Sequence, residues 1–209
     1  MSHSRIHGIY LAAGQSTRMG SDKLRLPLGS MCLGNYALAA ALNSCLDYIW
    51  IISSEARPDW MDHSFFEDPI HRKWSVISCP EAHLGQAASL RYGVQAANSM
   101  KATAVMILLA DQPLITKELI NELLRRYETG LLQQDIHYAA ASFEGLARPP
   151  VLFDHRMFAD LMQLQGDQGA RSLIRKDSSG ICIDFKIPNL FMDVDTPEDY
   201  QLLLDKMGL

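Results

Sequence analysis

Two cations and two carboxylates in this sequence stand where they could bind a phosphate group or a metal ion. Arg18 and Lys23 lie in the glycine-containing segment 11–23, which follows a short apolar run. Asp111 directly follows a second apolar run, and Asp195 precedes the last helical segment. Cationic side chains neutralise phosphate oxygens, and carboxylate oxygens are ligands that Mg²⁺ prefers. Arg18 and Lys23 predict a site for a phosphorylated substrate, Asp111 predicts a ligand for a divalent cation, and Asp195 belongs to a second acidic cluster.

The segment 11–23, LAAGQSTRMGSDK, differs from the two common glycine loops. Gly14 and Gly20 allow the backbone to approach a ligand closely, so that amides can point at phosphate oxygens. A Walker loop places Lys directly after its second glycine and then Ser or Thr, whereas Lys23 lies three positions beyond Gly20 and precedes Leu24. The dinucleotide pattern G-x-G-x-x-G is also absent. An ordinary strand-to-helix turn with solvated cations is the alternative.

The elements that must position these residues alternate between short apolar runs and amphipathic segments. Runs rich in β-branched and aromatic residues predict strands at 6–11, 48–53, 74–79, 104–110 and 138–143. Apolar spacing of three and four residues predicts helices at 35–46, 87–97 and 116–127. Because 104–110 is apolar at successive positions, we expect a central strand covered on both faces. The alternation predicts an α/β fold with a mainly parallel sheet.

The C-terminal third is less regular. Between about 143 and 187 we expect a short strand at 151–153 and helices at 155–163 and 169–176. We interpret this region as a second wall of a cleft within a single domain, 1–209, because no repeat or long linker interrupts the chain. Thr196 and Pro197 suit the start of a last helix that runs to about Lys206.

Composition limits the partners. The chain has 209 residues and a formal net charge of −5 at pH 7, so it has no global attraction for nucleic acids or anionic membranes. Its longest apolar run is far shorter than the roughly 20 residues that span a bilayer. Polar and glycine residues interrupt the apolar stretch near its start, so we expect no signal peptide. We expect a cytoplasmic protein. Cys32, Cys45, Cys79 and Cys182 form no C-x-x-C pair and favour reduced, mostly buried thiols.

The pattern L-A-A-G-x-S-x-R-M-G-x-x-K resembles the signature loop of the molybdenum cofactor cytidylyltransferases, within the MobA-like NTP transferase superfamily. The resemblance implies a single Rossmann-like nucleotidyltransferase domain whose loop wraps the triphosphate and the edge of the base. The loop residues implied to bind nucleotide are Leu11, Ala12, Ala13, Gly14, Ser16, Arg18, Gly20 and Lys23. Relatives that use GTP resemble L-A-G-G instead, so Ala13 favours CTP; one methyl group supports about 1 to 3 kcal/mol of discrimination.

Further segments extend the resemblance along nearly the whole chain. Residues 85–91, GQAASLR, are similar to G-Q-S-x-S-L-R and imply nucleotide contacts by Gly85, Gln86 and Ser89, although Ala87 replaces the usual serine.

The two carboxylates gain their roles from the same resemblance. Asp111 in A-D-Q-P-L and Asp195 in D-V-D-T-P-E-D are implied to hold Mg²⁺, with the role of Asp193 left open. The alternative is that Asp111 caps the turn before Thr116 and that the later acids stabilise the start of the last helix.

The acceptor side is implied by G-D-x-G-A-R at 166–171, which narrows the resemblance to the cytidylyltransferase branch. Asp167 and Arg171 would contact the acceptor, or would form a buried structural pair. Arg148 departs from the family, which often reads G-[H/N]-P-V-L-F where this chain has R-P-P-V-L-F. Arg148 could bind a phosphate or carboxylate, or could be a solvated loop residue.

The resemblance implies Mg²⁺-dependent transfer of CMP from CTP, or of another nucleotide, to the terminal phosphate of molybdopterin with release of pyrophosphate. The catalytic residues would be Arg18, Lys23, Asp111 and Asp195. An acceptor phosphate is already a nucleophile, so positioning and charge neutralisation suffice without a general base. One alternative is another phosphorylated acceptor, such as a sugar or polyol phosphate. Another is a non-catalytic protein that delivers the cofactor to a molybdenum enzyme or its chaperone.

Overall fold

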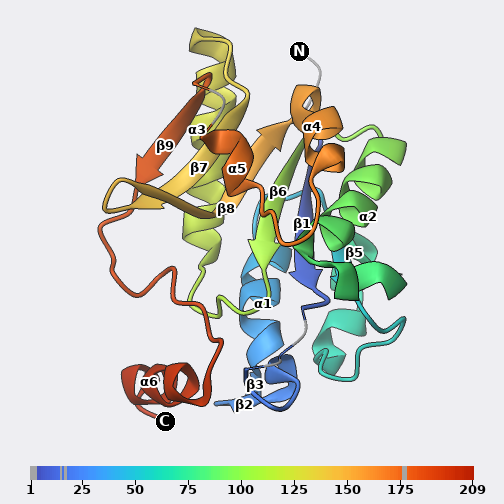
Figure 1. Cartoon of the computed structure of the whole chain (residues 1–209), viewed down its shortest axis with the longest axis vertical. Coiled ribbons are helices and arrows are strands. Elements are labelled where there is room, and N and C mark those ends of the chain that lie inside the picture. The colour runs from blue at the N-terminus through green and yellow to red at the C-terminus, as the bar shows by residue number, and fades with distance from the viewer. Residues whose placement is uncertain (1–3, 15, 17, 176–177) are drawn as a thin grey trace.

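The chain is built around a seven-stranded sheet in the order β5-β4-β1-β6-β8-β7-β9, seen in a computed structural model that describes residues 4–14, 16, 18–175 and 178–209 (Figure 1). The strands are β1 (Ile6–Ala12), β4 (Tyr48–Ser53), β5 (Trp74–Ser78), β6 (Ala104–Leu109), β7 (Tyr138–Phe143), β8 (Leu146–Asp154) and β9 (Gly180–Asp184). β5, β4, β1 and β6 are parallel, whereas β8 is antiparallel to both of its neighbours. The predicted α/β fold with a mainly parallel sheet is confirmed.

Helices cover both faces of the sheet. They are α1 (Tyr36–Leu42), α2 (Gln86–Ser99), α3 (Lys117–Gln133), α4 (Phe158–Gln163), α5 (Arg171–Ile174) and α6 (Pro197–Met207). In Figure 1, α2 and α4 lie in front of the sheet and α1 and α3 behind it. Leu38 and Ile120 pack into the core behind the sheet, and Leu90 and Leu161 into the core in front of it. The two cores give the Rossmann-like layering of helix, sheet and helix.

Shorter elements complete the chain. A small hairpin consists of β2 (Pro27–Leu28) and β3 (Met31–Cys32). The short 3₁₀ helices are η1 (Lys23–Arg25), η2 (Leu33–Asn35), η3 (His63–Phe66), η4 (Ile70–Lys73), η5 (Pro80–Leu84) and η6 (His155–Met157).

Strand β6 lies at the centre of the sheet, as its composition predicts. Val105 and Ile107 point into one core, and Met106 and Leu108 point into the other. Each such side chain contributes about 1.5 to 3 kcal/mol relative to an exposed one. A strand that supplies both cores must be apolar at successive positions, which makes β6 a rigid support for the residue that follows it.

Several predicted boundaries are wrong. β8 covers nine residues instead of 151–153, and β9 is an edge strand that the sequence analysis missed. Pro149 and Pro150 hide β8 in the sequence because proline disfavours a paired strand. In the structure they lie at a shift of register between β7 and β8, where the ladder is interrupted.

The predicted helices are in the right places but differ in length. α1 ends at Leu42 rather than at residue 46, and α3 continues to Gln133 rather than ending at residue 127. α5 covers part of the predicted 169–176 segment, whose residue 176 lies outside the described residues. α6 begins as predicted: the Thr196 hydroxyl accepts a hydrogen bond from the Asp199 amide, and Pro197 occupies the first turn.

The cysteines are less buried than expected. All four are free thiols, but only Cys79 is buried; Cys32 is half-buried, and Cys45 and Cys182 are exposed. Cys45 lies between α1 and β4, and Cys182 lies on the edge strand, where one side of the backbone has no neighbouring strand. Within the described residues, no helix is both long and apolar enough to cross a membrane.

Candidate active site

The predicted catalytic residues meet at the carboxyl edge of the parallel strands. The glycine loop follows β1, and Asp111 lies two residues beyond the end of β6. The segment before α6 reaches the same place because the Val194 amide donates a hydrogen bond to the Asp111 carbonyl, at 3.0 Å. This edge is where open α/β sheets commonly bind their ligands.

Lys23 joins the two carboxylates directly. Its Nζ donates to Asp111 Oδ2 at 2.7 Å and to Asp195 Oδ1 at 2.8 Å. The Lys23 side chain is 10% exposed, so water screens these contacts little. Arg18 donates to the second Asp195 oxygen at 2.8 Å, but its side chain is 67% exposed. Three segments that are far apart in sequence are thus held together by charge.

The contacts between opposite charges favour the charged forms of Lys23 and Asp195. Burial lowers the pKa of Lys23, but Asp111 and Asp195 outweigh that effect and raise it above its ordinary value. Burial raises the pKa of Asp195, but its contacts with Lys23 and Arg18 bring it below its ordinary value. At neutral pH Lys23 and Asp195 are therefore both charged.

Asp193 contacts Gln112, whereas Lys23 contacts Asp111 and Asp195. Asp193 accepts a hydrogen bond from Gln112 Nε2 at 2.8 Å. Burial and the nearby Asp111 raise its pKa, and the Gln112 hydrogen bond partly offsets them. Gln112 is fully buried, so this contact fixes the segment before α6 against the turn after β6.

The helix-capping alternatives for these acids do not hold. The start of α3 is capped by Thr116, whose hydroxyl accepts from the Leu119 amide at 3.3 Å. The start of α6 is capped by Thr196 together with Asp199. Asp111 and Asp195 point instead to Lys23.

The loop after β1 is shaped by local hydrogen bonds. The Ser16 hydroxyl accepts from the Lys23 amide at 3.1 Å, and Asp22 caps η1 by accepting from the Leu24 amide at 3.1 Å. Gly20 has φ of 72°, a left-handed conformation that favours glycine. These contacts turn the chain so that Lys23 enters the site from the loop.

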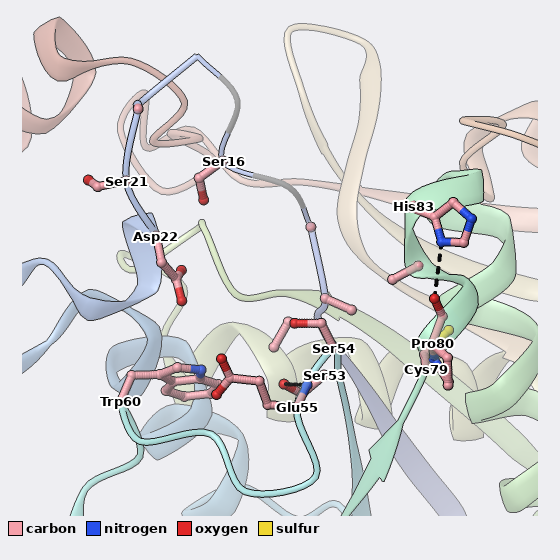
Figure 2. A pocket seen from close by; sticks show the side chains of 15 residues that line it. Ser16, Ser21, Asp22, Ser53, Ser54, Glu55, Trp60, Cys79, Pro80 and His83 are labelled. Carbon is pink, nitrogen blue, oxygen red and sulfur yellow. Dashed lines mark hydrogen bonds between the residues drawn. The ribbon is translucent and has the colours of Figure 1, made fainter.

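Two adjoining cavities lie at this edge. The lysine cavity, of about 460 Å³, contains both carboxylates and their cations. Its predicted residues are Leu11, Ala12, Ala13, Gly14, Arg18, Lys23, Gly85, Gln86, Ser89, Asp111, Asp167 and Asp195. The serine cavity, of about 700 Å³, is lined by Ser16, Gly20, Asp22, Ser53, Ser54, Glu55, Cys79, Pro80 and His83, among others (Figure 2). Ala12, Ala13 and Gly14 line both.

The start of α2 is fixed by a close backbone contact. Gly85 has φ of 108°, and a Cβ there would lie 2.3 Å from the Gly166 carbonyl carbon. The Ala87 amide donates to the Gly166 carbonyl at 3.0 Å. This contact brings Asp167 beside Gln86, where both line the lysine cavity.

The acceptor-side residues form a different arrangement. Arg171 and Asp167 line a third space, the arginine cavity, of about 300 Å³, which shares Gln86, Leu109 and Asp167 with the lysine cavity. Burial and the positive charge of Arg148 lower the pKa of Arg171. Arg148 therefore lies close to Arg171, and its Nε is buried with no hydrogen-bond partner among the described residues.

The structural pair that we considered between Asp167 and Arg171 is not formed. Asp167 is exposed, and neither residue makes a salt bridge within the part of the chain that the structure describes.

Several residues at these cavities were missed in the sequence. Ser53 ends β4, Ser54 and Glu55 follow it, and His83 lies in η5 before α2. The signal was available, because β4 is a predicted parallel strand and its carboxyl end must open on the same edge as those of β1 and β6. Gln112 follows Asp111 directly, but nothing in the sequence marks its burial.

The carboxylates fit a divalent cation. Asp111 Oδ1 is buried with no hydrogen-bond partner among the described residues, so one carboxylate oxygen is available to a further ligand. In the described ranges no three His, Cys, Asp or Glu side chains converge as a metal-binding group. Two carboxylates would therefore supply part of a coordination sphere, and Mg²⁺ commonly completes such a sphere with phosphate oxygens and waters.

Comparison with known proteins agrees with the fold. Residues 8–181 match the family model of the MobA-like NTP transferase domain. The purine catabolism protein PucB of Bacillus subtilis (strain 168) is 35% identical over 205 residues, which cover 96% of this chain and 97% of PucB.

Solved structures show the same fold. Rv0371c from Mycobacterium tuberculosis H37Rv has a TM-score of 0.75 and 24% identity, covering 97% of this chain and 99% of its own; a second crystal structure of that protein is a complex with manganese. Mth528, a nucleotidyl transferase from Methanothermobacter, has a TM-score of 0.74 and 16% identity, covering 99% of both chains. With the family model spanning most of the sequence, the chain belongs to the MobA-like NTP transferase family.

Proposed function

We propose that this protein is a Mg²⁺-dependent cytidylyltransferase that transfers CMP from CTP to the terminal phosphate of molybdopterin and releases pyrophosphate. The observation that carries the proposal is the joining of Arg18, Lys23, Asp111 and Asp195 in one cavity of a MobA-like chain. We infer that residues 1–209 act as a single domain, in which about 143–187 supplies the acceptor wall.

Lys23 and Arg18 bind the triphosphate in this proposal. An oxygen of the acceptor phosphate attacks the α-phosphorus, and the bond from that phosphorus to the oxygen bridging to the β-phosphate breaks. Negative charge then accumulates on pyrophosphate, where the two cations stabilise it. Lys23 already lies inside the cavity, whereas Arg18 is mostly exposed at its rim, so we assign the reacting centre to Lys23 and the outer phosphates to Arg18.

Asp111 and Asp195 would hold the divalent cation. When bound, Mg²⁺ would supply charge neutralisation at the phosphates. The unpartnered Oδ1 of Asp111 supports this role, as does the manganese complex of Rv0371c. Gln112 and Asp193 position the two carboxylates because they tie the segment before α6 to the turn after β6.

The remaining nucleotide contacts come from the two glycine-containing segments. Leu11 to Gly14 would lie by the base and Gln86 and Ser89 by the ribose or phosphates, consistent with their lining of the lysine cavity. Ala13 favours CTP over GTP because its methyl group narrows the space for a purine.

The acceptor would bind at the arginine cavity. Arg171 lines this cavity, and the charge of Arg148 acts on it from the neighbouring strand, opposed in part by Asp193. Neither arginine makes a salt bridge among the described residues, and a phosphate dianion suits two guanidinium groups. Ile107, Leu109, Pro149 and Val151 give the cavity an apolar wall suited to a ring system. Similarity to PucB supports a role in purine catabolism, in which a molybdenum enzyme would use the product.

Radiolabel transfer tests the reaction. With CTP labelled at the α-phosphate and molybdopterin as acceptor, the label should appear in the cofactor product and unlabelled pyrophosphate should be released. Label in a sugar or polyol phosphate product instead would identify the alternative acceptor. Tight cofactor binding with no release of pyrophosphate from any nucleoside triphosphate would identify a delivery protein and refute the enzyme.

A further inference from the structure

The serine cavity and the lysine cavity differ in charge. Arg18 and Lys23 line the lysine cavity, but no lysine or arginine among the described residues lines the serine cavity. Ala12, Ala13 and Gly14 form a wall common to both. A nucleotide whose phosphates contact Arg18 and Lys23 would therefore extend its uncharged end past this wall into the serine cavity.

Glu55 is fixed at the floor of the serine cavity. Arg25 donates to Glu55 Oε1 at 2.8 Å, to Asp22 Oδ2 at 3.0 Å and to Asp59 Oδ2 at 2.9 Å. One guanidinium thus ties the exit of the glycine loop to the segment after β4. In Figure 2, Glu55 lies beside Trp60 with Asp22 on the same side, opposite Pro80 and His83.

One oxygen of the Glu55 carboxylate is available to a ligand. Its contact with Arg25 uses only Oε1, and Oε2 accepts no hydrogen bond from any described residue. The Glu55 side chain is 48% exposed at the cavity, so a ligand can reach it. Three carboxylates share one guanidinium, which leaves this wall with net negative charge and a preference for hydrogen-bond donors.

The opposite wall has the same polarity. His83 Nδ1 lies 3.0 Å from the Pro80 carbonyl, which can only accept, so Nδ1 carries the proton and Nε2 of the neutral ring is an acceptor. The Glu55 carboxylate and this ring nitrogen are therefore two acceptors that face the cavity, and they suit a ring edge that carries N–H groups.

We propose that Glu55, held in place by Arg25, accepts a hydrogen bond from the exocyclic amino group of the nucleotide base and thereby selects cytosine against uracil. The inference deepens the proposed function, because it depends on the triphosphate lying at Lys23. Cytosine presents an amino group where uracil presents a carbonyl oxygen, which would face the carboxylate without a proton between them. A site built for a donor rejects the analogue that lacks it.

Calorimetric titration with CTP and UTP in the presence of Mg²⁺ tests the proposal without an acceptor. The wild-type protein should bind CTP at least about tenfold more tightly than UTP. Glu55→Gln keeps the size of the side chain but supplies an amide N–H that can pair with the uracil oxygen. We expect CTP affinity to fall about tenfold in this variant, UTP affinity to rise, and the ratio to approach one.

Asp59→Asn is the matched control, because Asp59 contacts the same guanidinium but does not line the cavity. It should keep the CTP to UTP ratio within about twofold of the wild type, whereas a general loosening of Arg25 would change both variants alike. Equal wild-type affinity for CTP and UTP, or an unchanged ratio in a folded Glu55→Gln protein, overturns the proposal. If no nucleoside triphosphate binds at all, the proposed function fails with it; if pyrophosphate release persists without base preference, only this inference fails.

Discussion

The lysine cavity and the arginine cavity share three residues, yet they treat charge in opposite ways. Lys23 and Arg18 each contact a carboxylate at 2.7 to 2.8 Å. Arg148 and Arg171 have no salt bridge within the described residues, and the charge of one lowers the pKa of the other. The charges of the lysine cavity neutralise one another by direct contact, whereas the two arginines at the arginine cavity make no direct contact with a carboxylate of the described residues.

This difference predicts which substitutions should affect stability and which should affect only the binding of a ligand. A paired charge that loses its partner leaves the other uncompensated, so a substitution in the lysine cavity should cost stability as well as function. Two neighbouring guanidinium groups repel each other, so a substitution in the arginine cavity should relieve the repulsion and weaken only the binding of an anion. In the proposed function, the lysine cavity binds the nucleotide and the cation together, and the arginine cavity binds the anionic acceptor.

The largest expected effect is on the carboxylate that lies deepest in the lysine cavity. Asp111→Ala should lower turnover by at least about a hundredfold, the scale on which a single preorganised electrostatic group acts. Pyrophosphate release at saturating Mg²⁺ measures it, with the exposed Asp205→Ala as control. Near-normal turnover in the variant would remove Asp111 from the reacting centre.

Removal of the unpaired cations should produce a smaller effect with a different signature. Arg148→Gln and Arg171→Gln should each raise the KM for the acceptor about 10- to 100-fold, because a lost charge-assisted hydrogen bond is worth about 1.5 to 3 kcal/mol. Nucleotide affinity and Tm should not fall. The exposed Arg72→Gln is the control, and a variant with lower Tm but unchanged KM would show that the two arginines are structural.

A substitution that removes the cation of the lysine cavity should lower the stability of the protein. Lys23→Met leaves Asp111 and Asp195 facing each other and should lower the free energy of unfolding by about 1 to 3 kcal/mol in urea titrations at pH 7. The pKa of Asp195 is lower in the folded protein than in the unfolded chain. Its contribution to folding stability is therefore complete above the unfolded pKa of about 3.9 and is lost as the pH falls through the folded pKa.

The same titrations, repeated at alkaline pH, should show the contribution of Lys23 to folding stability. The pKa of Lys23 is higher in the folded protein than in the unfolded chain. Its contribution to folding stability is therefore complete below the unfolded pKa of about 10.4 and is lost as the pH rises through the folded pKa. The gap between wild type and Lys23→Met should be widest from about pH 5 to 9 and narrow on both sides. A gap independent of pH would mean that packing, rather than charge, causes it.

The smallest effect is expected at the wall between the lysine and serine cavities. Ala13→Gly should shift the preference between CTP and GTP toward GTP by about tenfold, near the lower end of the 1 to 3 kcal/mol that one methyl group supports. Relative kcat/KM values for the two nucleotides measure the shift. An unchanged ratio would assign the choice between CTP and GTP to residues other than Ala13.

Sequence reasoning succeeded where local pattern and function coincide. The apolar run before Asp111 predicts a central strand, and a central parallel strand must deliver the next residue to the sheet edge. The glycine loop likewise follows β1 directly. The direct contacts of Lys23 with Asp111 and Asp195 were not predicted. The resemblance assigns the carboxylates to Mg²⁺ and Lys23 to the nucleotide, and a sequence carries no distances across 88 and 172 residues.

The rest could not be read because it depends on contacts between segments. Arg148 could be solvated or bound in the sequence, and only its position beside Arg171 distinguishes the two. Glu55 has no motif of its own; its place depends on Arg25, thirty residues earlier. The strand β8 is hidden by its prolines, which are tolerated at the shift of register. Pairing partners, not local propensity, decide these positions.

Pyrophosphate release from CTP, GTP, ATP and UTP, each with molybdopterin and with simple sugar phosphates, tests the central claim most directly. Both cavities must work together for any pair to react. We predict that CTP with molybdopterin is the fastest pair and that sugar phosphates support little release. Release that is independent of molybdopterin, or fastest with a sugar phosphate, would contradict the assignment of the arginine cavity to a molybdopterin phosphate.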